Sequence, residues 1–222
     1  MSKSIIFLGA SGAVGSVALE HILSFSGINK ILLLGRRKLN VEDQDNLEQQ
    51  IVSITDAISY ESYIVDFDTA ICTLGVGEPS KMKNDEFVKI DKTAVLDFAI
   101  TCKKNGVKHF QLLSSVGVSA SSKSFYLKIK GELVEALEAL KFDRLSIFQP
   151  SLIITPTNRY GLSQGIVLKL WPRLHFMMQG KAQKYRGIKV EELGKAIANN
   201  TLTTGLGTEY LHYAQFKSLI KG

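Results

Sequence analysis

Short apolar runs alternate with longer segments of helical periodicity over the first two-thirds of the chain. The apolar runs predict buried strands at Ser4–Leu8, Lys30–Leu34, Gln50–Ile54, Thr69–Leu74, His109–Ser114 and Arg144–Phe148. The periodic segments predict helices at Ala13–Leu23, Asp85–Lys104 and Phe125–Leu140. Buried strands that alternate with helices are typical of a parallel sheet with right-handed crossovers. The pattern therefore predicts an α/β fold with a doubly wound parallel sheet and helices on both faces.

The alternation stops beyond Pro150. A turn-rich stretch, an apolar aromatic segment within Gly165–Arg186 and a helix near Val190–Asn199 follow. The aromatic segment is compatible with core packing, with an apolar substrate pocket, with a dimer face or with contact to a membrane surface. We expect one domain over residues 1–222, in which residues 151–222 contribute a small C-terminal substrate lobe.

Three glycines at three-residue spacing lie between the first predicted strand and the first predicted helix. Gly9 can supply a tight turn, Gly12 lets the backbone approach a pyrophosphate, and Gly15 lets the helix pack close to the strand. The helix N-terminus offers free N–H groups and a positive dipole end to the phosphates. A glycine turn without a ligand is the alternative interpretation. The flanking strand, helix and crossover favour a dinucleotide site in a single NAD(P)-binding domain of the Rossmann type.

The end of the second predicted strand indicates which dinucleotide binds. An NAD site usually has Asp or Glu here, which binds the ribose 2′-hydroxyl. The chain instead has Arg36 and Arg37 after Gly35, and no acidic residue before Glu42. Guanidinium groups match phosphate oxygens in shape and charge, so the pair favours NADP(H). One of the two arginines could equally well end the strand and face solvent.

A serine, a tyrosine and a lysine follow in an order that suits carbonyl chemistry. Ser114 and Ser115 end the fifth predicted strand, and we favour Ser115 as the donor to a substrate carbonyl oxygen. Tyr126 and Lys130 lie four residues apart and therefore share one helix face. A nearby ammonium stabilises a phenolate, which makes Tyr126 a usable acid and base. Lys130 can also hold ribose hydroxyls. By itself, such a pair is as compatible with a ring that packs on an aliphatic stem.

These motifs together resemble the short-chain dehydrogenase/reductase superfamily, in its atypical branch. The similar segments are FLGASGAVG, ILLLGRRKL, CTLG, FVKIDKTAVLDFA, KHFQLLSSVGVSASSKSFYLKIKGELVEAL and KFDRLSIFQPSLI. The resemblance implies a Rossmann fold. It assigns these cofactor contacts: Ser11, Gly12, Ala13, Val14, Arg36, Arg37, Leu74, Gly75, Lys130, Ile153 and Arg159. It also assigns Tyr126 as the acid/base residue and Lys130 as its partner. Gln149-Pro150-Ser151 departs from the Arg-Pro-Gly of that branch.

Composition and charge narrow the classes of function. The formal charge of +6 comes from scattered residues without a nucleic-acid-binding signature, so we expect no nucleic-acid partner. The two cysteines are too few for a disulfide framework, and the four histidines have no metal-ligand spacing, so no metal is predicted. No apolar run approaches the length of a membrane span, and the N-terminus leaves no room for a signal peptide. The expected location is the cytoplasm.

The sequence leaves three functional hypotheses. The first is an NADPH-binding oxidoreductase that reduces a small or medium apolar carbonyl compound through Ser115, Tyr126 and Lys130. The second is an NADP(H)-binding redox sensor that acts through a protein partner without turnover, since fold alone does not determine function. The third, a sugar epimerase or dehydratase, is disfavoured by the short tail. A homodimer is compatible with each of them.

Overall fold

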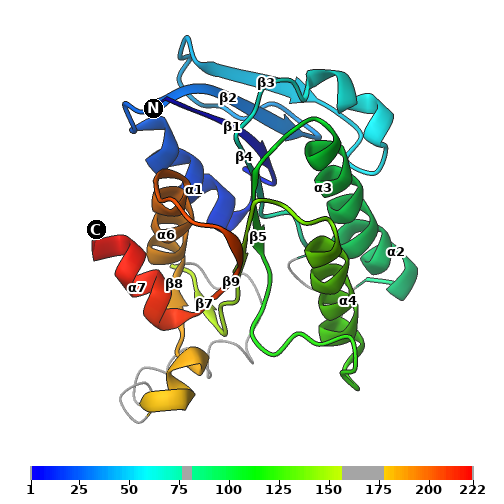
Figure 1. Cartoon of the computed structure of the whole chain (residues 1–222), viewed down its shortest axis with the longest axis vertical. Helices are drawn as coiled ribbons and strands as arrows, with labels where there is room; N and C mark the ends of the chain where they lie inside the picture. The colour runs from blue at the N-terminus through cyan, green and yellow to red at the C-terminus, as the bar shows by residue number, and fades with distance from the viewer. Residues whose placement is uncertain (1, 77–81, 157–177, 222) are drawn as a thin grey trace.

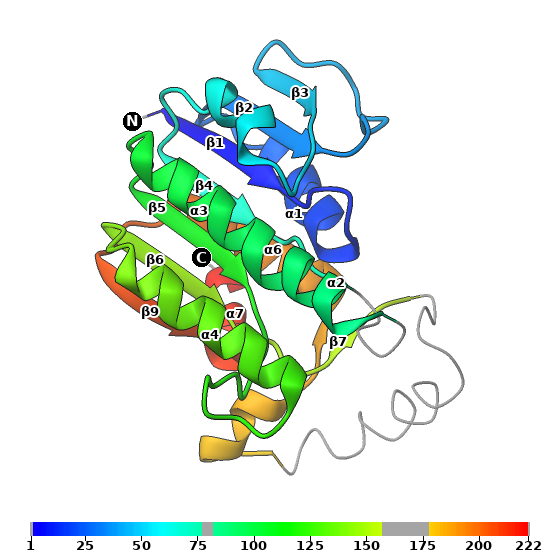
Figure 2. The same cartoon turned by 90° about the vertical axis from the view of Figure 1, so that its right-hand side faces the viewer.

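A parallel sheet of seven strands forms the centre of the computed structural model, which describes residues 2–76, 82–156 and 178–221. The strand order is β3-β2-β1-β4-β5-β6-β9 (Figures 1 and 2). The strands are β1 (Lys3–Leu8), β2 (Ile28–Gly35), β3 (Leu47–Ile51), β4 (Thr69–Cys72), β5 (His109–Leu113), β6 (Arg144–Phe148) and β9 (Gly207–Leu211). The order reverses between β1 and β4, where a doubly wound sheet binds its ligands. The predicted Rossmann-type fold is confirmed.

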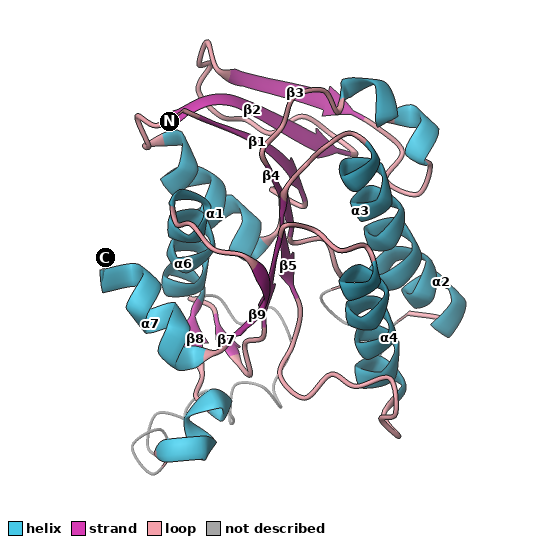
Figure 3. Cartoon of the chain, viewed as in Figure 1, coloured by secondary structure: helices cyan, strands magenta, loops and turns pink. Residues whose placement is uncertain are grey.

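Helices cover both faces of the sheet. One face carries α1, α6 and α7, and the other carries α2, α3 and α4 (Figures 1 and 3). Their bounds are α1 (Ala13–Leu23), α2 (Asn84–Val88), α3 (Ala94–Lys104), α4 (Phe125–Ala139), α6 (Val190–Leu202) and α7 (Tyr213–Lys221). Each described helix is too short or too polar to cross a bilayer.

The two faces of β1 explain why its sequence is a continuous apolar run. Ile6 and Leu8 belong to the core under α3 and α4, whereas Ile5 and Phe7 belong to the core under α1 and α6. All four side chains are at most 1% exposed. A strand covered by helices on both sides has no polar face, so its residues do not alternate.

Two parts of the prediction differ from the structure. The third strand occupies Leu47–Ile51 rather than Gln50–Ile54, because it is an edge strand whose Glu and Gln side chains point partly into solvent. The segment predicted as one regular helix, Asp85–Lys104, consists of α2, a π-helical turn at Lys89–Thr93, and α3.

The chain beyond Pro150 contributes to the main sheet. Strand β9 pairs with β6, and α6 packs against α1. A second, two-stranded sheet joins β7 (Ile153–Ile154) to β8 (Ile188–Lys189). Most of the apolar aromatic segment of the predicted lobe, residues 157–177 with Arg159, lies outside the described residues. The substrate lobe stays a prediction.

A buried polar network joins the amino-terminal edge of the sheet to α6 and β9. Ser146 Oγ lies 2.8 Å from His109 Nε2 and donates to Glu209 Oε1 at 2.5 Å. Arg144 donates through Nε to Glu209 Oε1 at 2.8 Å and through Nη2 to Asn200 Oδ1 at 2.7 Å. Burial, together with the positive charge of Arg144, lowers the pKa of His109 to about 3. His109 is therefore neutral in the folded protein near neutral pH.

This neutral histidine makes stability depend on pH. Below the ordinary histidine pKa of about 6.5, the unfolded chain binds a proton at His109 that the folded protein does not bind. The stabilisation is thus complete above that pH and is lost as the pH falls. Between pH 7.5 and pH 5.5 we expect His109 to lower the free energy of unfolding by about 1.4 kcal/mol. Urea unfolding at both pH values measures it. In a His109→Gln protein, the decrease in the free energy of unfolding between these pH values should be smaller by about 1.4 kcal/mol. An equal decrease in both proteins would contradict the assignment to His109.

Candidate functional site

One cleft of about 580 Å³ lies at the carboxyl ends of β1, β4, β5 and β6, and α4 forms its far wall. Several of the predicted site residues line it: Gly12, Ala13, Val14, Gly15, Leu74, Gly75, Ser115, Tyr126, Lys130 and Ile153. Gly9, Ser11, Arg36 and Arg37 do not line it. The carboxyl ends of parallel strands meet at one edge, which explains how residues more than one hundred positions apart come together.

The first and third glycines of the loop are required by close backbone contacts. Gly9 has φ +97°, and a Cβ there would lie 2.5 Å from the backbone nitrogen of Leu74. A Cβ on Gly15 would lie 2.3 Å from the carbonyl oxygen of Gly9. Thr73 Oγ1 donates to that same oxygen at 2.9 Å and so links the loops after β1 and β4. Both positions therefore require glycine, because a Cβ at either one would overlap backbone atoms of the loops that follow β1 and β4.

The second glycine faces open space at the N-terminus of α1. A Cβ on Gly12 would contact only the carbonyl oxygen of Gly9, at 3.3 Å, so the space beside Gly12 is not filled by other described residues. Gly12 is the N-cap, no side chain caps the helix, and its first turn holds no acidic residue. A helix start with free N–H groups and no competing carboxylate suits a phosphate group. The loop therefore fits a dinucleotide.

Two arginines lie beyond the end of β2. Arg36 and Arg37 are exposed, and neither forms an ion pair with a described residue. Arg37 shares a small hollow with Ser11 of the glycine loop and with Gly35. Arg37 is thus placed to bind an anion next to that loop, and Arg36 adjoins it in the sequence.

The serine and tyrosine side chains meet in the cleft. Both Ser114 and Ser115 line it. Ser114 is buried, and its Oγ has no hydrogen-bond partner among the described residues, whereas Ser115 is half-buried. Tyr126 is half-buried, and its ring centroid lies 5.7 Å from that of Phe87 on α2. A buried hydroxyl without a partner is uncommon in proteins and suits a ligand that supplies one.

Lys130 forms a buried ion pair that the sequence did not predict. Its Nζ lies 2.7 Å from Asp91 Oδ1, and the two side chains are 6% and 1% exposed. The other oxygen, Asp91 Oδ2, accepts from the backbone N–H of Val76 at 2.8 Å. Asp91 belongs to the π-helical turn, and such turns frequently occur at functional sites. An ammonium has three donors, so Lys130 keeps others for a ligand.

A pattern in the sequence could have identified Asp91. Phe87, Asp91 and Val95 follow one another at spacings of four, which places them on one helix face. Phe87 is 2% and Val95 0% exposed, so Asp91 is the acidic member of a buried stripe. A buried carboxylate requires a partner, and Lys130 is the cation that reaches it.

The other ionisable groups in and near the cleft do not suggest nucleophilic or metal chemistry. Burial raises the pKa of Cys72 to about 12, with a partial offset from a backbone hydrogen bond of Leu74 and from Lys130. This thiol is therefore protonated near neutral pH. No group of three or more His, Cys, Asp or Glu side chains within the described part of the chain is placed to hold a metal ion.

Comparisons with known proteins show the family to which the chain belongs. Residues 9–145 match the family model described as NAD(P)H-binding. Protein HTATIP2 of Rattus norvegicus is 35% identical over 93% of this chain and 84% of its own length. The mitochondrial protein FMP52 of Meyerozyma guilliermondii is 35% identical over 67% of this chain and 64% of its own length.

A solved structure shows the same fold. MoeE5 in complex with UDP-glucose and NAD superposes with a TM-score of 0.70 over 94% of this chain and 75% of its own, at 15% sequence identity. At that identity the likeness concerns the fold alone. The family match and the identity to HTATIP2 go further. The chain belongs to the NAD(P)H-binding family and, within it, to the group of proteins that includes HTATIP2.

Proposed function

We propose that this protein is an NADP(H)-dependent oxidoreductase that reduces a small or medium-sized apolar carbonyl compound. The observation that carries the proposal is the single cleft in which the glycine loop, Ser115, Tyr126 and Lys130 meet. Beside these polar side chains, glycine and aliphatic residues such as Gly75, Val76 and Leu152 line the cleft, which suits a nicotinamide and an uncharged substrate.

Each side chain has a distinct role in the proposed reaction. When bound, the cofactor supplies hydride to the carbonyl carbon. Tyr126 donates its phenolic proton to the carbonyl oxygen, so the product is an alcohol and the phenolate is reprotonated from solvent. Ser115 donates a hydrogen bond that positions the carbonyl. The buried Ser114 hydroxyl can share this role, because Ser114 also lines the cleft. Lys130 binds ribose hydroxyls with the donors that Asp91 does not use.

The preference for NADP(H) rests on Arg36 and Arg37. We expect NADPH to bind more tightly than NADH, because each guanidinium that bonds the 2′-phosphate contributes a charge-assisted hydrogen bond. Arg36→Ala and Arg37→Ala should each weaken NADPH by about tenfold to a hundredfold and leave NADH unchanged. Calorimetric titration with both dinucleotides measures the effect.

The neighbouring exposed residue Lys38 offers a matched control. Lys38→Ala removes one positive charge beside the pair and should change the affinity for NADPH much less than either arginine variant. Equal binding of NADH and NADPH by the unmodified protein would show the assignment of Arg36 and Arg37 to be wrong. Failure of both dinucleotides to bind would remove the oxidoreductase proposal.

A second candidate is a redox sensor that binds NADP(H) and signals to a protein partner without turnover. The buried Asp91–Lys130 pair favours it, because a lysine neutralised by a carboxylate stabilises a phenolate on Tyr126 less than a free one does. Partner binding that depends on the cofactor, without turnover of any carbonyl compound, would support the sensor.

The proposals for the location and the partners rest on the sequence alone. We propose a cytoplasmic protein with a small-molecule carbonyl substrate, no nucleic-acid partner, and a homodimer or protein partner. The fungal relative is named as mitochondrial, so fractionation of cells that express this chain tests the location directly.

A further inference from the structure

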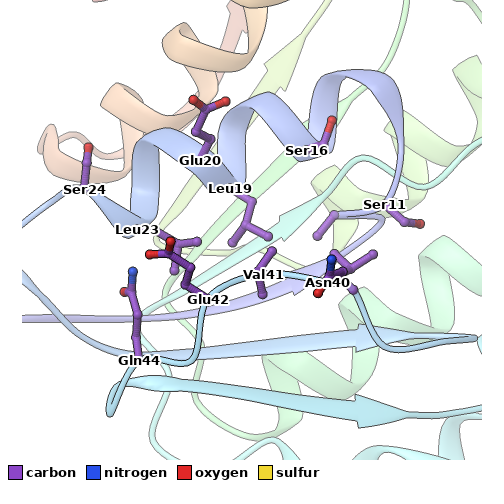
Figure 4. Close-up of a pocket in the computed structure, with 12 residues that line it drawn as sticks. Ser11, Ser16, Leu19, Glu20, Leu23, Ser24, Asn40, Val41, Glu42 and Gln44 are labelled. Carbon is purple, nitrogen blue, oxygen red and sulfur yellow. The ribbon is translucent and has the colours of Figure 1, made fainter.

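A second cavity lies outside the cleft, between α1 and the connection from β2 to β3 (Figure 4). Its volume is about 500 Å³, which is within the range of small-molecule sites. We define the α1 groove as this cavity. Its lining comes from α1, from residues 39–44, and from Ala10 and Ser11.

The groove exists because one crossover has no helix. Neighbouring parallel strands are usually joined through a helix that packs on the sheet. Here β1 and β2 are joined through α1, and β5 and β6 through α4, whereas residues 36–46 between β2 and β3 contain no helix. Leu39 and Val41 of this connection pack on the α1 side of the core but fill only part of the space beside α1.

The base of the α1 groove is apolar. Leu19 is 2% exposed, and Leu23, Leu39 and Val41 are half-buried. The four side chains come from α1 and from the facing connection, and Figure 4 shows Leu19, Leu23 and Val41 close together between them. Such a base favours an apolar ligand through burial of its surface.

Hydrogen bonds hold the connection in place, so the groove does not depend on a ligand for its shape. The side chain of Gln49 accepts from Leu39 N at 2.8 Å and donates to Leu39 O at 3.2 Å. At the other end, Asn46 Nδ2 donates to Ile28 O at 2.9 Å, and Ile31 N donates to Asn46 O at 2.7 Å. Small-molecule sites are usually preformed in this way.

The charged side chains that line the groove favour a cationic ligand. Glu20 on α1 and Glu42 on the connection line it, both are exposed, and neither forms an ion pair with a described residue. The chain carries +6 overall, yet residues 39–80 hold nine Asp and Glu and neither Lys nor Arg. The basic residues 36–38 lie just before this stretch and do not line the groove. The charged side chains that line the groove are thus acidic, opposite in sign to the net charge, although Arg37 lies in the neighbouring hollow that shares Ala10, Ser11 and Leu39 with it.

We infer that the α1 groove binds an apolar amine, with its hydrocarbon body on the leucine and valine side chains and its ammonium at Glu42, whose side chain lies beside Leu23 (Figure 4). This site is separate from the proposed cofactor cleft. Because Ala10 and Ser11 line its end, its ligand would also contact the glycine loop.

The test compares three probes that share one apolar body: 4-phenylbutylamine, 4-phenylbutanol and 4-phenylbutyrate. Each is titrated into the protein without cofactor, and amide chemical shifts are followed by NMR. We expect the amine to bind at least about threefold more tightly than the alcohol, the carboxylate to bind weakest, and the shifts to concentrate in α1 and residues 39–44. Added salt should weaken only the amine.

Matched variants separate the contributions of charge and apolar surface. Glu42→Gln should reduce the preference for the amine, whereas Glu48→Gln, an exposed acidic residue outside the groove, should not. Leu23→Ser should weaken all three probes, whereas Leu206→Ser, at an exposed leucine far along the chain, should weaken none. Equal binding of the three probes, shifts confined to the cofactor cleft, or no binding at the solubility limit would each overturn the inference.

Discussion

Tyr126→Phe protein should reduce a carbonyl substrate about 10²- to 10⁴-fold more slowly than the unmodified protein, with an unchanged affinity for NADPH. The substitution removes the proton donor of the proposed reaction. The ring remains and keeps its contact with Phe87, whose centroid is 5.7 Å away. The fold and the cleft wall are therefore preserved. Steady-state oxidation of NADPH measures turnover, and calorimetry measures cofactor affinity.

Tyr60 supplies a control of the same chemistry. It is fully buried in the core, with its ring against that of Phe98 on α3. Its hydroxyl has no partner among the described residues, and burial raises its pKa. Tyr60→Phe removes a hydroxyl that makes no hydrogen bond, so turnover should be unaffected. If Tyr126→Phe retained full turnover, another group would be the proton donor and the proposed mechanism would be wrong.

Lys130→Met should both abolish cofactor-dependent turnover and destabilise the protein. Asp91 is 1% exposed and has Lys130 as its ion-pair partner, so the variant leaves a buried carboxylate without a cation. Removal of one member of a buried ion pair typically costs about 3–5 kcal/mol. Urea unfolding of the two proteins at neutral pH measures the loss.

A double variant separates stability from function. Asp91→Asn in the Lys130→Met protein removes the unpaired charge and keeps a side-chain oxygen for the N–H of Val76. We expect most of the stability to return and the turnover to remain absent. A loss of stability below about 1 kcal/mol in Lys130→Met would show that water screens Asp91, since exposed pairs contribute no more than that.

Much of the fold is visible in the sequence because most strands are buried on both faces. The run at residues 144–148 illustrates this, since the predicted strand and β6 coincide. Edge strands lack this signal: β3 presents Glu48, Gln49 and Gln50 to a partly solvated surface, so no apolar run marks it. Strand β9 is likewise an edge, with Gly207, Thr208 and Tyr210 exposed.

The candidate site was predictable where chain geometry dictates residue type. Gly9 needs a positive φ, and Gly15 needs contact with backbone at a distance that a Cβ forbids. Such constraints restrict the residue to glycine, so they leave a pattern. Asp91 escaped prediction although its spacing from Phe87 and Val95 places it on a buried face, because a carboxylate on such a face does not by itself reveal its partner. Its partner lies thirty-nine positions further on, and single-sequence periodicity does not report such long-range pairs.

The position of β9 and α6 has a consequence for how the protein is made. On the ribosome, the glycine loop leaves the exit tunnel well before α6, which covers the adjacent α1 and packs Gly194 directly on Val17. The outer edge of β6 stays open until residues 207–211 have been translated, and Arg144 lacks Glu209 until then. Between the synthesis of β6 and that of β9, a nascent chain therefore presents an unpaired strand edge and an incomplete core. The sheet and the core around α1 can be completed only after α6 and β9 have left the tunnel, so the nucleotide loop is stabilised by segments that are translated well after it.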